Sequence, residues 1–170
     1  SNDPIIAITG SNGKTTTSNM LYNMCQSKEV EGTMAGNMGI PFSERVLNSI
    51  KDPKENILYI LEISSFQLEF IKHFSPDILV YTNISPDHLD RHGIMAAYAA
   101  VKASLFDGAR CGVIGAQDSY TQDIAKQIQG KGACDLTCVT GDLSPQQQNQ
   151  KMAIAIVQHL GVEAPQALCA

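Results

Sequence analysis

The chain has 170 residues, of which 44% are hydrophobic and 17% charged, and its formal net charge is −5. This length and composition are typical of one soluble globular domain that can bury a sizeable core. The acidic balance, with no cluster of lysine and arginine, argues against nucleic acid or an anionic membrane as the main partner. No apolar run approaches the roughly 20 residues that a membrane span needs.

The five cysteines are an odd number and show no Cys-x-x-Cys spacing. Cys134 and Cys138 fall in an apparent strand, where alternate residues share a face. We therefore interpret them as small core residues rather than metal ligands or disulfide partners. This use of cysteine, with no visible secretory signal, predicts a reducing compartment and hence a cytoplasmic protein.

Short apolar segments alternate with helical patterns along the chain. Strands are expected over residues 5–9, 57–63, 78–84, 112–115 and 136–139. Helices are expected over residues 15–26, 41–49, 66–73, 95–106, 119–129 and 149–160. The middle strands are continuous apolar runs, which is typical of strands covered on both faces. The alternation therefore predicts an α/β fold, a mostly parallel sheet flanked by helices, whose ligands bind at the carboxyl ends of the strands.

The first strand leads into a glycine-rich turn, and a helical pattern follows it. The turn reads Thr9-Gly10-Ser11-Asn12-Gly13-Lys14-Thr15-Thr16. Glycines let backbone N–H groups curl around phosphate oxygens, and a helix N-terminus adds positive potential. In such a turn Lys14 would place its charge on the terminal phosphates, and the Thr15 hydroxyl would ligate Mg²⁺. Because the common P-loop pattern has a glycine where this chain has Ile8, the alternative is an ordinary strand-to-helix turn.

Ionisable residues follow two further strands. Glu62 comes near the end of the apolar run that begins at Ile57. Because a carboxylate in an apolar strand is costly unless it is paired or binds metal, we favour Mg²⁺ ligation over a glutamate that turns outward or has a buried partner. Asp87 and His88 lie in a charged cluster after residues 78–84, although His88 could equally be an ordinary loop histidine. If the three strands are neighbours, the turn, Glu62 and this cluster meet at one rim.

The helix expected after this cluster carries a lysine on its apolar face. Met95, Tyr98, Lys102 and Leu105 are spaced three, four and three residues apart, so they share that face. Lys102 could extend its amine to solvent, which is the usual case. If the amine stays inside, desolvation lowers its pKa and leaves it nucleophilic, so that it could take up CO₂ as a carbamate and ligate a hard metal.

Together these residues resemble the central ATP-binding domain of the Mur ligases, which build the peptide stem of bacterial cell-wall precursors. The glycine-rich turn has the shortened spacing of the phosphate loop in that family. Further similar segments, in the order of the family, are residues 36–41, 61–69, 82–91 and 98–102. Residues 61–69 most resemble the members that add D-glutamate. The resemblance covers most of residues 4–161.

The resemblance implies a P-loop NTPase-like fold and an ATP-dependent, ADP-forming ligase of peptidoglycan biosynthesis, which serves cell shape and cell division. In that family ATP phosphorylates a carboxylate, here that of UDP-N-acetylmuramoyl-L-alanine. The amine of the incoming amino acid, here D-glutamate, then attacks the acyl phosphate to form the amide.

The resemblance also implies roles for individual residues. The implied ATP contacts are Gly10, Ser11, Asn12, Gly13, Lys14, Thr15, Thr16 and Asn149. The implied magnesium ligands are Thr15 and Glu62 at one site, and His88 with a carbamylated Lys102 at a second. The implied catalytic residues are Lys14, His88 and Lys102, and Asn37 and Ser64 match positions that touch the muramoyl substrate.

Two features depart from the pattern of the family. Residues 140–149 are too few for the β-rich segment that usually precedes the adenine-contacting helix, and they lack its Gly-x-His-Asn motif. Counting back from Gly161 places Asn149 at the adenine-contacting asparagine. In addition, residues 1–170 have no counterpart of the UDP-binding and amino-acid-binding domains. We therefore expect a single central domain, monomeric, that does not catalyse ligation alone.

Two alternatives stay open at this point. The chain could be the central domain of another Mur-type ligase or of a folylpolyglutamate synthase, against which the run Ser64-Ser65-Phe66-Gln67 argues. It could also be a nucleotide-binding module without catalysis. Glu62, His88 and Lys102 favour an enzyme, because binding a nucleotide requires the phosphate loop but not a second metal site.

Overall fold

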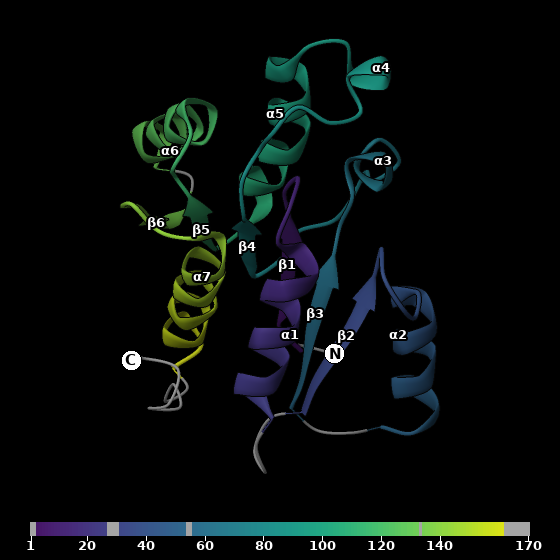
Figure 1. The fold of residues 1–170 in the computed structure, drawn as a ribbon. Coiled ribbons are helices and arrows are strands. Elements are labelled where there is room, and N and C mark those ends of the chain that lie inside the picture. The colour runs from purple at the N-terminus through teal and green to yellow at the C-terminus, as the bar shows by residue number, and fades with distance from the viewer. Residues whose placement is uncertain (1–2, 27–30, 54–55, 133, 162–170) are drawn as a thin grey trace.

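The structure is a computed structural model that describes residues 3–26, 31–53, 56–132 and 134–161. Within these ranges six strands form one sheet in the order β2-β3-β1-β4-β5-β6 (Figure 1). Every neighbouring pair of strands is parallel. The strands are β1 (Ile5–Thr9), β2 (Glu31–Gly36), β3 (Ile57–Glu62), β4 (Ile78–Tyr81), β5 (Cys111–Gly115) and β6 (Asp135–Val139). The expected parallel α/β fold is confirmed.

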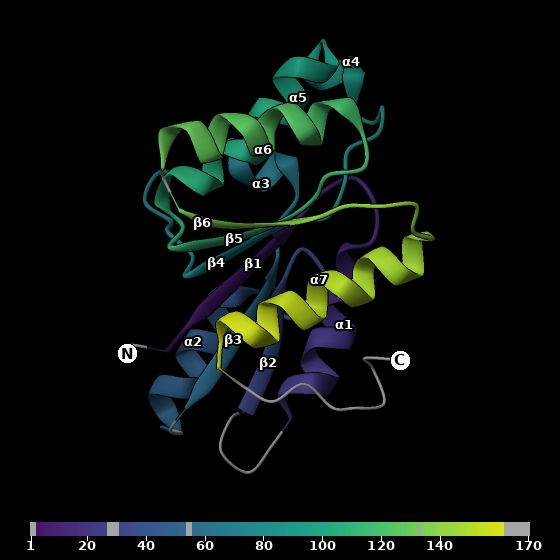
Figure 2. The same cartoon turned by 90° about the vertical axis from the view of Figure 1, so that its left-hand side faces the viewer.

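Helices cover both faces of the sheet. The described helices are α1 (Lys14–Cys25), α2 (Phe42–Lys51), α3 (Ser65–Leu68), α4 (Leu89–His92), α5 (Met95–Ala103), the 3-10 helix η1 (Ser104–Gly108), α6 (Ser119–Lys131) and α7 (Pro145–His159). In Figure 2, α1 and α7 lie below the sheet, whereas α3, α5 and α6 lie above it.

Alternate residues of each strand supply the two cores. Ile6 and Ile8 pack with α1 and α7, whereas Ala7 faces the other core, which α3, α5 and α6 complete. Burial on both faces explains why these strands are unbroken apolar runs. Within the described ranges, no helix is long and apolar enough to cross a membrane.

Several expected boundaries were wrong. The strand expected over 57–63 ends at Glu62, and the one expected over 78–84 ends at Tyr81. The helix expected over 66–73 is only α3, because the chain then tightens into i→i−3 bonds, such as that from the Phe70 N–H to the Gln67 carbonyl (3.1 Å). The helix expected over 95–106 becomes 3-10 in form after Ala103.

Helix α7 begins at Pro145 rather than at Asn149. Ser144 and Gln147 form a capping box, in which the Ser144 N–H donates to Gln147 Oε1 (2.9 Å) and the Gln147 N–H donates to Ser144 Oγ (3.3 Å). A capping box satisfies backbone donors at the first turn, and proline favours the first helical position. These residues therefore extend the helix toward the phosphate loop and leave only a short connection from β6.

The sequence analysis missed β2 and α4. Strand β2 contains two glycines and no apolar run, and it becomes a strand by pairing with β3 along its whole length. Helix α4 is one exposed turn between two residues of positive φ, His88 (51°) and Gly93 (76°). Its charged residues give no hydrophobic period from which a helix could be predicted.

Candidate functional site

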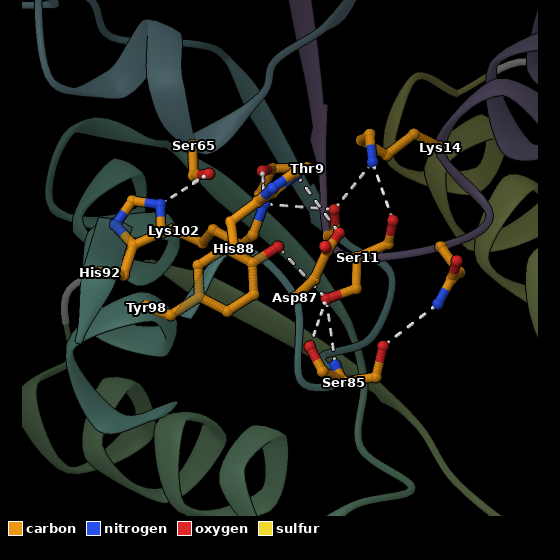
Figure 3. A network of polar contacts seen from close by, with 12 residues as sticks. Thr9, Ser11, Lys14, Ser65, Ser85, Asp87, His88, His92, Tyr98 and Lys102 are labelled. Atoms are coloured by element: carbon orange, nitrogen blue, oxygen red, sulfur yellow. Dashed lines mark hydrogen bonds and ion pairs between the residues drawn. The ribbon is translucent and has the colours of Figure 1, made fainter. Parts of the chain in front are cut away.

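Strands β3, β1 and β4 are neighbours, so the segments that follow them meet at one rim, as expected. A cavity of about 180 Å³ opens there. Its lining consists of Gly10, Ser11, Lys14, Asn37, Ser64, Ser65, Phe66, Asp87, His88, Tyr98 and Lys102. Figure 3 shows Lys14, Lys102, Asp87 and His88 around this rim. The structure thus brings together most of the residues that the sequence singled out.

The glycine-rich loop is fixed against the segment that follows β4. The Ser11 N–H donates to the Asn83 carbonyl (3.0 Å), and Thr82 Oγ1 donates to the Asn12 carbonyl (2.6 Å). Gly10 has a φ of 140°, and a Cβ added there would lie 2.0 Å from Thr82 Oγ1. Only glycine fits so close an approach at this φ. The loop is therefore held in one conformation by its neighbour.

Lys14 lies folded back over this loop. Its Nζ donates to the carbonyls of Gly10 (2.9 Å) and Ser11 (3.0 Å). Partial burial lowers the pKa of Lys14, while the charges of Glu62 and Asp87 oppose that effect. The charged amine is thus held at the loop by two neutral acceptors, which a phosphate could replace.

Glu62 is buried at the end of β3, with 2% of its surface exposed. This excludes a glutamate that turns outward. Its Oε2 accepts a hydrogen bond from Thr15 Oγ1 (3.0 Å), whereas Oε1 has no hydrogen-bond partner among the described residues. A buried carboxylate oxygen without a partner is costly, and together with a threonine hydroxyl it offers the oxygen ligands that Mg²⁺ prefers. The pair Thr15 and Glu62 therefore fits a magnesium ion.

Lys102 is also buried, at 2% exposure, so it does not extend to solvent. Its Nζ donates to the Gly10 carbonyl (3.2 Å) and lies 4.8 Å from the centre of the Tyr98 ring. Burial, followed by the charge of Lys14, lowers the pKa of Lys102 to about 8, and Asp87 opposes this shift. The amine of Lys102 thus stays inside, and burial disfavours its charged form, which is the condition stated above for a nucleophilic amine.

His88 and Asp87 occupy the exposed side of the rim. His88 Nε2 lies 3.4 Å from Asp87 Oδ2, and the two side chains are 45% and 48% exposed. The ring of Phe66 packs edge-on against His88 with the centroids 4.7 Å apart. The backbone of His88 has a positive φ, and its side chain lines the cavity. Asp87 and Phe66 are the side chains described above as its contacts, and both lie at this rim.

The remaining predicted residues surround the cavity or the loop. The Asn37 N–H donates to the Glu62 carbonyl (2.8 Å), which places Asn37 beside Glu62. Ser64 is the N-cap of α3 and lines the cavity. Asn149 is buried against Gly13, where an added Cβ would lie 2.6 Å from its Oδ1. Asn149 thus packs behind the loop and is not part of the cavity lining, and Thr16 is exposed on α1.

The network in Figure 3 also contains residues to which the sequence analysis assigned no role: Thr9, Ser65, Ser85, His92 and Tyr98. Tyr98 Oη lies 3.3 Å from Ser11 Oγ, and His92 Nε2 lies 3.0 Å from Ser65 Oγ. Tyr98 could have been found from the sequence, since it lies one helical turn before Lys102. No local signal marks the pair of Ser65 and His92, which are 27 residues apart.

The first strand of this parallel sheet ends in a glycine-rich loop, a lysine lies over the loop, and a buried carboxylate ends the neighbouring strand β3. This arrangement is typical of phosphate-binding α/β domains. Residues 8–160 match the family model of the Mur ligase middle domain. The chain therefore belongs to the Mur ligase family through this middle domain.

The curated relatives agree with this assignment. The chain is 38% identical over 129 residues to the UDP-N-acetylmuramoylalanine--D-glutamate ligase of Wolbachia pipientis wMel, which covers 76% of this chain and 24% of that protein. It is 39% identical over 130 residues to the protein of the same name from Koribacter versatilis, covering 75% and 28%. The chain thus spans about a quarter of the length of the relatives it matches.

Solved structures show the same fold at lower identity. The MurF ligase from Thermotoga maritima in complex with ADP superimposes with a TM-score of 0.72 at 18% identity, over 96% of this chain and 47% of that one. A Mycobacterium tuberculosis folylpolyglutamate synthase complexed with ADP and AMPPCP gives 0.71 at 14% identity, over 98% and 57%. At these identities the likeness concerns the fold.

Proposed function

We propose that this chain is the ATP-binding domain of an ADP-forming ligase that adds D-glutamate to UDP-N-acetylmuramoyl-L-alanine. The observation that carries the proposal is the buried Glu62 carboxylate, which accepts a hydrogen bond from Thr15 directly after the phosphate loop and keeps one oxygen unpartnered. The names of the relatives support the choice of substrates. We also propose a cytoplasmic protein of peptidoglycan biosynthesis that is monomeric.

The loop residues would bind and orient ATP. Backbone N–H groups from Gly13 to Thr16 would donate to phosphate oxygens, because those of Ser11 and Asn12 already donate to Asn83. Lys14 would leave the two loop carbonyls to contact the terminal phosphates. Thr15 and Glu62 would hold one Mg²⁺, and His88 with Lys102 a second, which would neutralise the repulsion between ATP and the substrate carboxylate. Asn37 and Ser64 line the same cavity and would orient the muramoyl substrate.

Lys102 would act as a metal ligand only after modification. After the ammonium has released a proton, the neutral amine attacks CO₂: the N–C bond forms as the electron pair of one C=O bond moves to oxygen. A further proton leaves the nitrogen for solvent, so that the neutral amine becomes an anionic carbamate. The pKa of about 8 supports this step, because neutral amine is then available near neutral pH. Labelling with ¹³CO₂ tests it: a carbamate carbon signal is expected in the wild type and not in Lys102→Met. An unlabelled Lys102 in the substrate-bound full-length enzyme contradicts the carbamate.

Nucleotide binding by the chain alone is the direct test of the function. Calorimetric titration with a non-hydrolysable ATP analogue and Mg²⁺ is expected to give one site and no ligation activity, because the acceptor must come from other parts of the protein. Lys14→Ala should weaken binding about 10- to 100-fold, in line with the roughly 1.5–3 kcal/mol of a hydrogen bond to a charged group. Lys126→Ala, on the exposed face of α6, is the matched control.

Two results would contradict the proposal: no binding by the wild type, or equal binding by Lys14→Ala and the wild type. The magnesium assignment has its own test in Glu62→Gln, which keeps the shape of the side chain. In this variant the affinity for the ATP analogue should depend less steeply on the Mg²⁺ concentration than in the wild type. If that dependence stays as in the wild type, Glu62 is not a ligand.

A second candidate is a folylpolyglutamate synthase or another Mur-type ligase, which the structural neighbours favour equally at the level of the fold. The two candidates differ in the carboxylate and the amine that they join. Release of ADP from the full-length enzyme, measured over a panel of amino acids with each acceptor, separates them. Turnover with D-glutamate and UDP-N-acetylmuramoyl-L-alanine supports the first candidate, and turnover with a folate and L-glutamate supports the second.

A further inference from the structure

Three potential metal ligands meet at the amino ends of the strands, at the opposite end of the sheet from the phosphate loop. Cys111 is the first residue of β5 and Asp135 the first of β6, and the two are register partners in the parallel pair. His159 is the last residue of α7. One ligand atom from each of the three residues lies within 4.8 Å of the other two. Because all the strands are parallel, their amino ends lie away from the rim that holds Lys14 and Glu62.

The orientation of the His159 ring suits metal binding. Its Nε2 lies 3.0 Å from Thr137 Oγ1, and its Nδ1 lies 4.0 Å from Asp135 Oδ2. With the proton on Nε2, the ring donates to the threonine and the lone pair of Nδ1 is directed toward the Asp135 carboxylate. Metal-binding histidines commonly have this arrangement, in which the second nitrogen donates to a fixed acceptor that sets the tautomer. Thr137 lies on the same face of β6 as Asp135, two residues along the strand.

We propose that Cys111, Asp135 and His159 form a binding site for a zinc-class divalent cation. A thiolate, an imidazole nitrogen and one carboxylate are ligands typical of Zn²⁺, whereas Mg²⁺ and Ca²⁺ require oxygen ligands. Three protein ligands leave the fourth tetrahedral position to water. Access for that water comes from the side of Asp135, whose side chain is 78% exposed. Binding breaks the S–H bond of Cys111 as the bond from sulfur to the metal forms, and the proton goes to solvent.

The distances require only a small adjustment. Metal bonds of about 2.0–2.3 Å place tetrahedral ligand atoms about 3.3–3.8 Å apart, so a separation of 4.8 Å, the upper limit here, must close by roughly 1–1.5 Å. Rotation of the exposed Asp135 side chain about its own bonds can bring its carboxylate oxygen closer to the other two ligand atoms. The backbone is already in place, since Cys111 and Asp135 are held by the pairing of β5 and β6.

A bound ion would join the last turn of α7 to the two strands. Cys111 and Asp135 are 24 residues apart in the sequence, and so are Asp135 and His159. The ion would therefore link three elements that are distant in sequence. Because the site forms only in the folded chain, binding stabilises the native state by mass action. Helix α7 also carries Asn149, which packs against Gly13, so the proposed site lies at the far end of the helix that supports the phosphate loop.

Metal binding by the complete 170-residue chain, untagged and kept reduced with a phosphine, tests the proposal. Titration with Zn²⁺ is expected to show one site and a rise in the unfolding temperature that a chelator reverses. Titration with Co²⁺ is expected to give a thiolate-to-metal charge-transfer band and the intense visible bands of a tetrahedral ion. Cys111→Ser should lose the charge-transfer band, and His159→Gln should weaken binding at least tenfold.

Matched controls separate this site from other thiols and histidines. Cys134→Ser changes a cysteine that precedes Asp135 but packs in the core on the opposite face of the sheet. His73→Gln changes an exposed histidine. Both should bind like the wild type. Asp135→Asn alters only an exposed side chain, so it keeps the test valid if Cys111→Ser folds poorly, and it should also weaken binding. Absence of saturable binding, a cobalt spectrum without the thiolate band, or equal losses in the controls would overturn the proposal.

Discussion

The two sides of the candidate site are held in different ways. On one side, the phosphate loop is fixed by its backbone: the Ser11 N–H and the Asn12 carbonyl bond to the segment after β4, and Gly10 fits beside Thr82 at close approach. On the other side, α3 and α4 are joined by side chains, such as Phe66 against His88 (4.7 Å) and Ser65 with His92 (3.0 Å).

The difference indicates which side is ready for its ligand. Backbone bonds that are partly buried hold the loop in one conformation, so the proposed phosphate site would be formed before ATP binds. The α3–α4 side depends on half-exposed rings and charges that a bound substrate can rearrange at little cost. Lys102 joins the two sides, because its amine donates to the Gly10 carbonyl and lies over the Tyr98 ring. Substitutions on the loop side should therefore have the larger effects.

Gly10→Ala should have the largest effect. The added Cβ would lie 2.0 Å from Thr82 Oγ1 at a φ of 140°. Strain and overpacking each cost about 1–3 kcal/mol, so we expect a loss of about 3 kcal/mol or more in the free energy of unfolding, together with loss of nucleotide binding. Urea denaturation measures the first and calorimetry the second.

The matched control for this prediction is Gly132→Ala. Gly132 also has a positive φ (61°), but no atom lies within 4 Å of an added Cβ. Its substitution should cost only the backbone preference, about 1 kcal/mol. If the two variants lose equal stability, the phosphate loop is not the rigid side of the site.

Lys102 provides a pH-dependent test at the junction of the two sides. Burial lowers the pKa of Lys102 in the folded chain to about 8 from the ordinary 10.5. Between these values the unfolded chain binds more protons than the folded chain, so the stability contributed by this group rises with pH from about 8 to 10.5. Below pH 8 the charged amine destabilises the fold, by an amount on the order of 3 kcal/mol.

Lys102→Met should therefore be more stable than the wild type at pH 7.5, and the gap should close as the pH approaches 10. Urea denaturation across this range measures the difference in free energy of unfolding between the variant and the wild type. Other titrating groups contribute equally to both proteins and therefore cancel in this difference. Lys126→Met, at an exposed position, should show no such gap. A constant difference between Lys102→Met and the wild type at all pH values would contradict the burial of a charged amine.

The sequence predicted the loop side well, and the reason is local. The strand, glycines and lysine are contiguous, and burial of Glu62 was expected from its position in an apolar run. Burial of Lys102 was only one of two alternatives, because a lysine on an apolar helix face usually extends its amine to solvent. The α3–α4 side was not predictable in the same way, because Ser65 meets His92 only after the strand order is set. Asn149 was assigned to the adenine site by counting; its side chain packs against Gly13 of the loop, and the adenine contact stays a prediction.

Tyr98→Phe should have an effect of intermediate size. Tyr98 Oη lies 3.3 Å from Ser11 Oγ, which also donates to the Ser85 carbonyl (3.1 Å) and accepts from the Ser85 N–H (3.0 Å). Removing the tyrosine hydroxyl leaves Ser11 with its backbone partners, so we expect a loss of about 1 kcal/mol in the free energy of unfolding. Ser11→Ala should cost more, because it also leaves the Ser85 N–H without its acceptor. The reverse order would mean that the side chains, rather than the backbone, hold the loop.

Glu69→Gln should have the smallest effect, and it tests the α3–α4 side directly. Glu69 accepts two bonds from Arg91, at 2.8 Å from Nε and 2.5 Å from Nη2, but Arg91 is 49% exposed. Ion pairs of this kind contribute little, since water and salt screen them.

The bond from Arg91 lowers the pKa of Glu69, so the small stabilisation should be present above the ordinary pKa of 4.5 and disappear as the pH falls below it. Thermal unfolding of the wild type and the variant at low and high salt measures it. A large loss that salt leaves unchanged would show that this side is as firmly held as the phosphate loop, and the distinction between the two sides would fail.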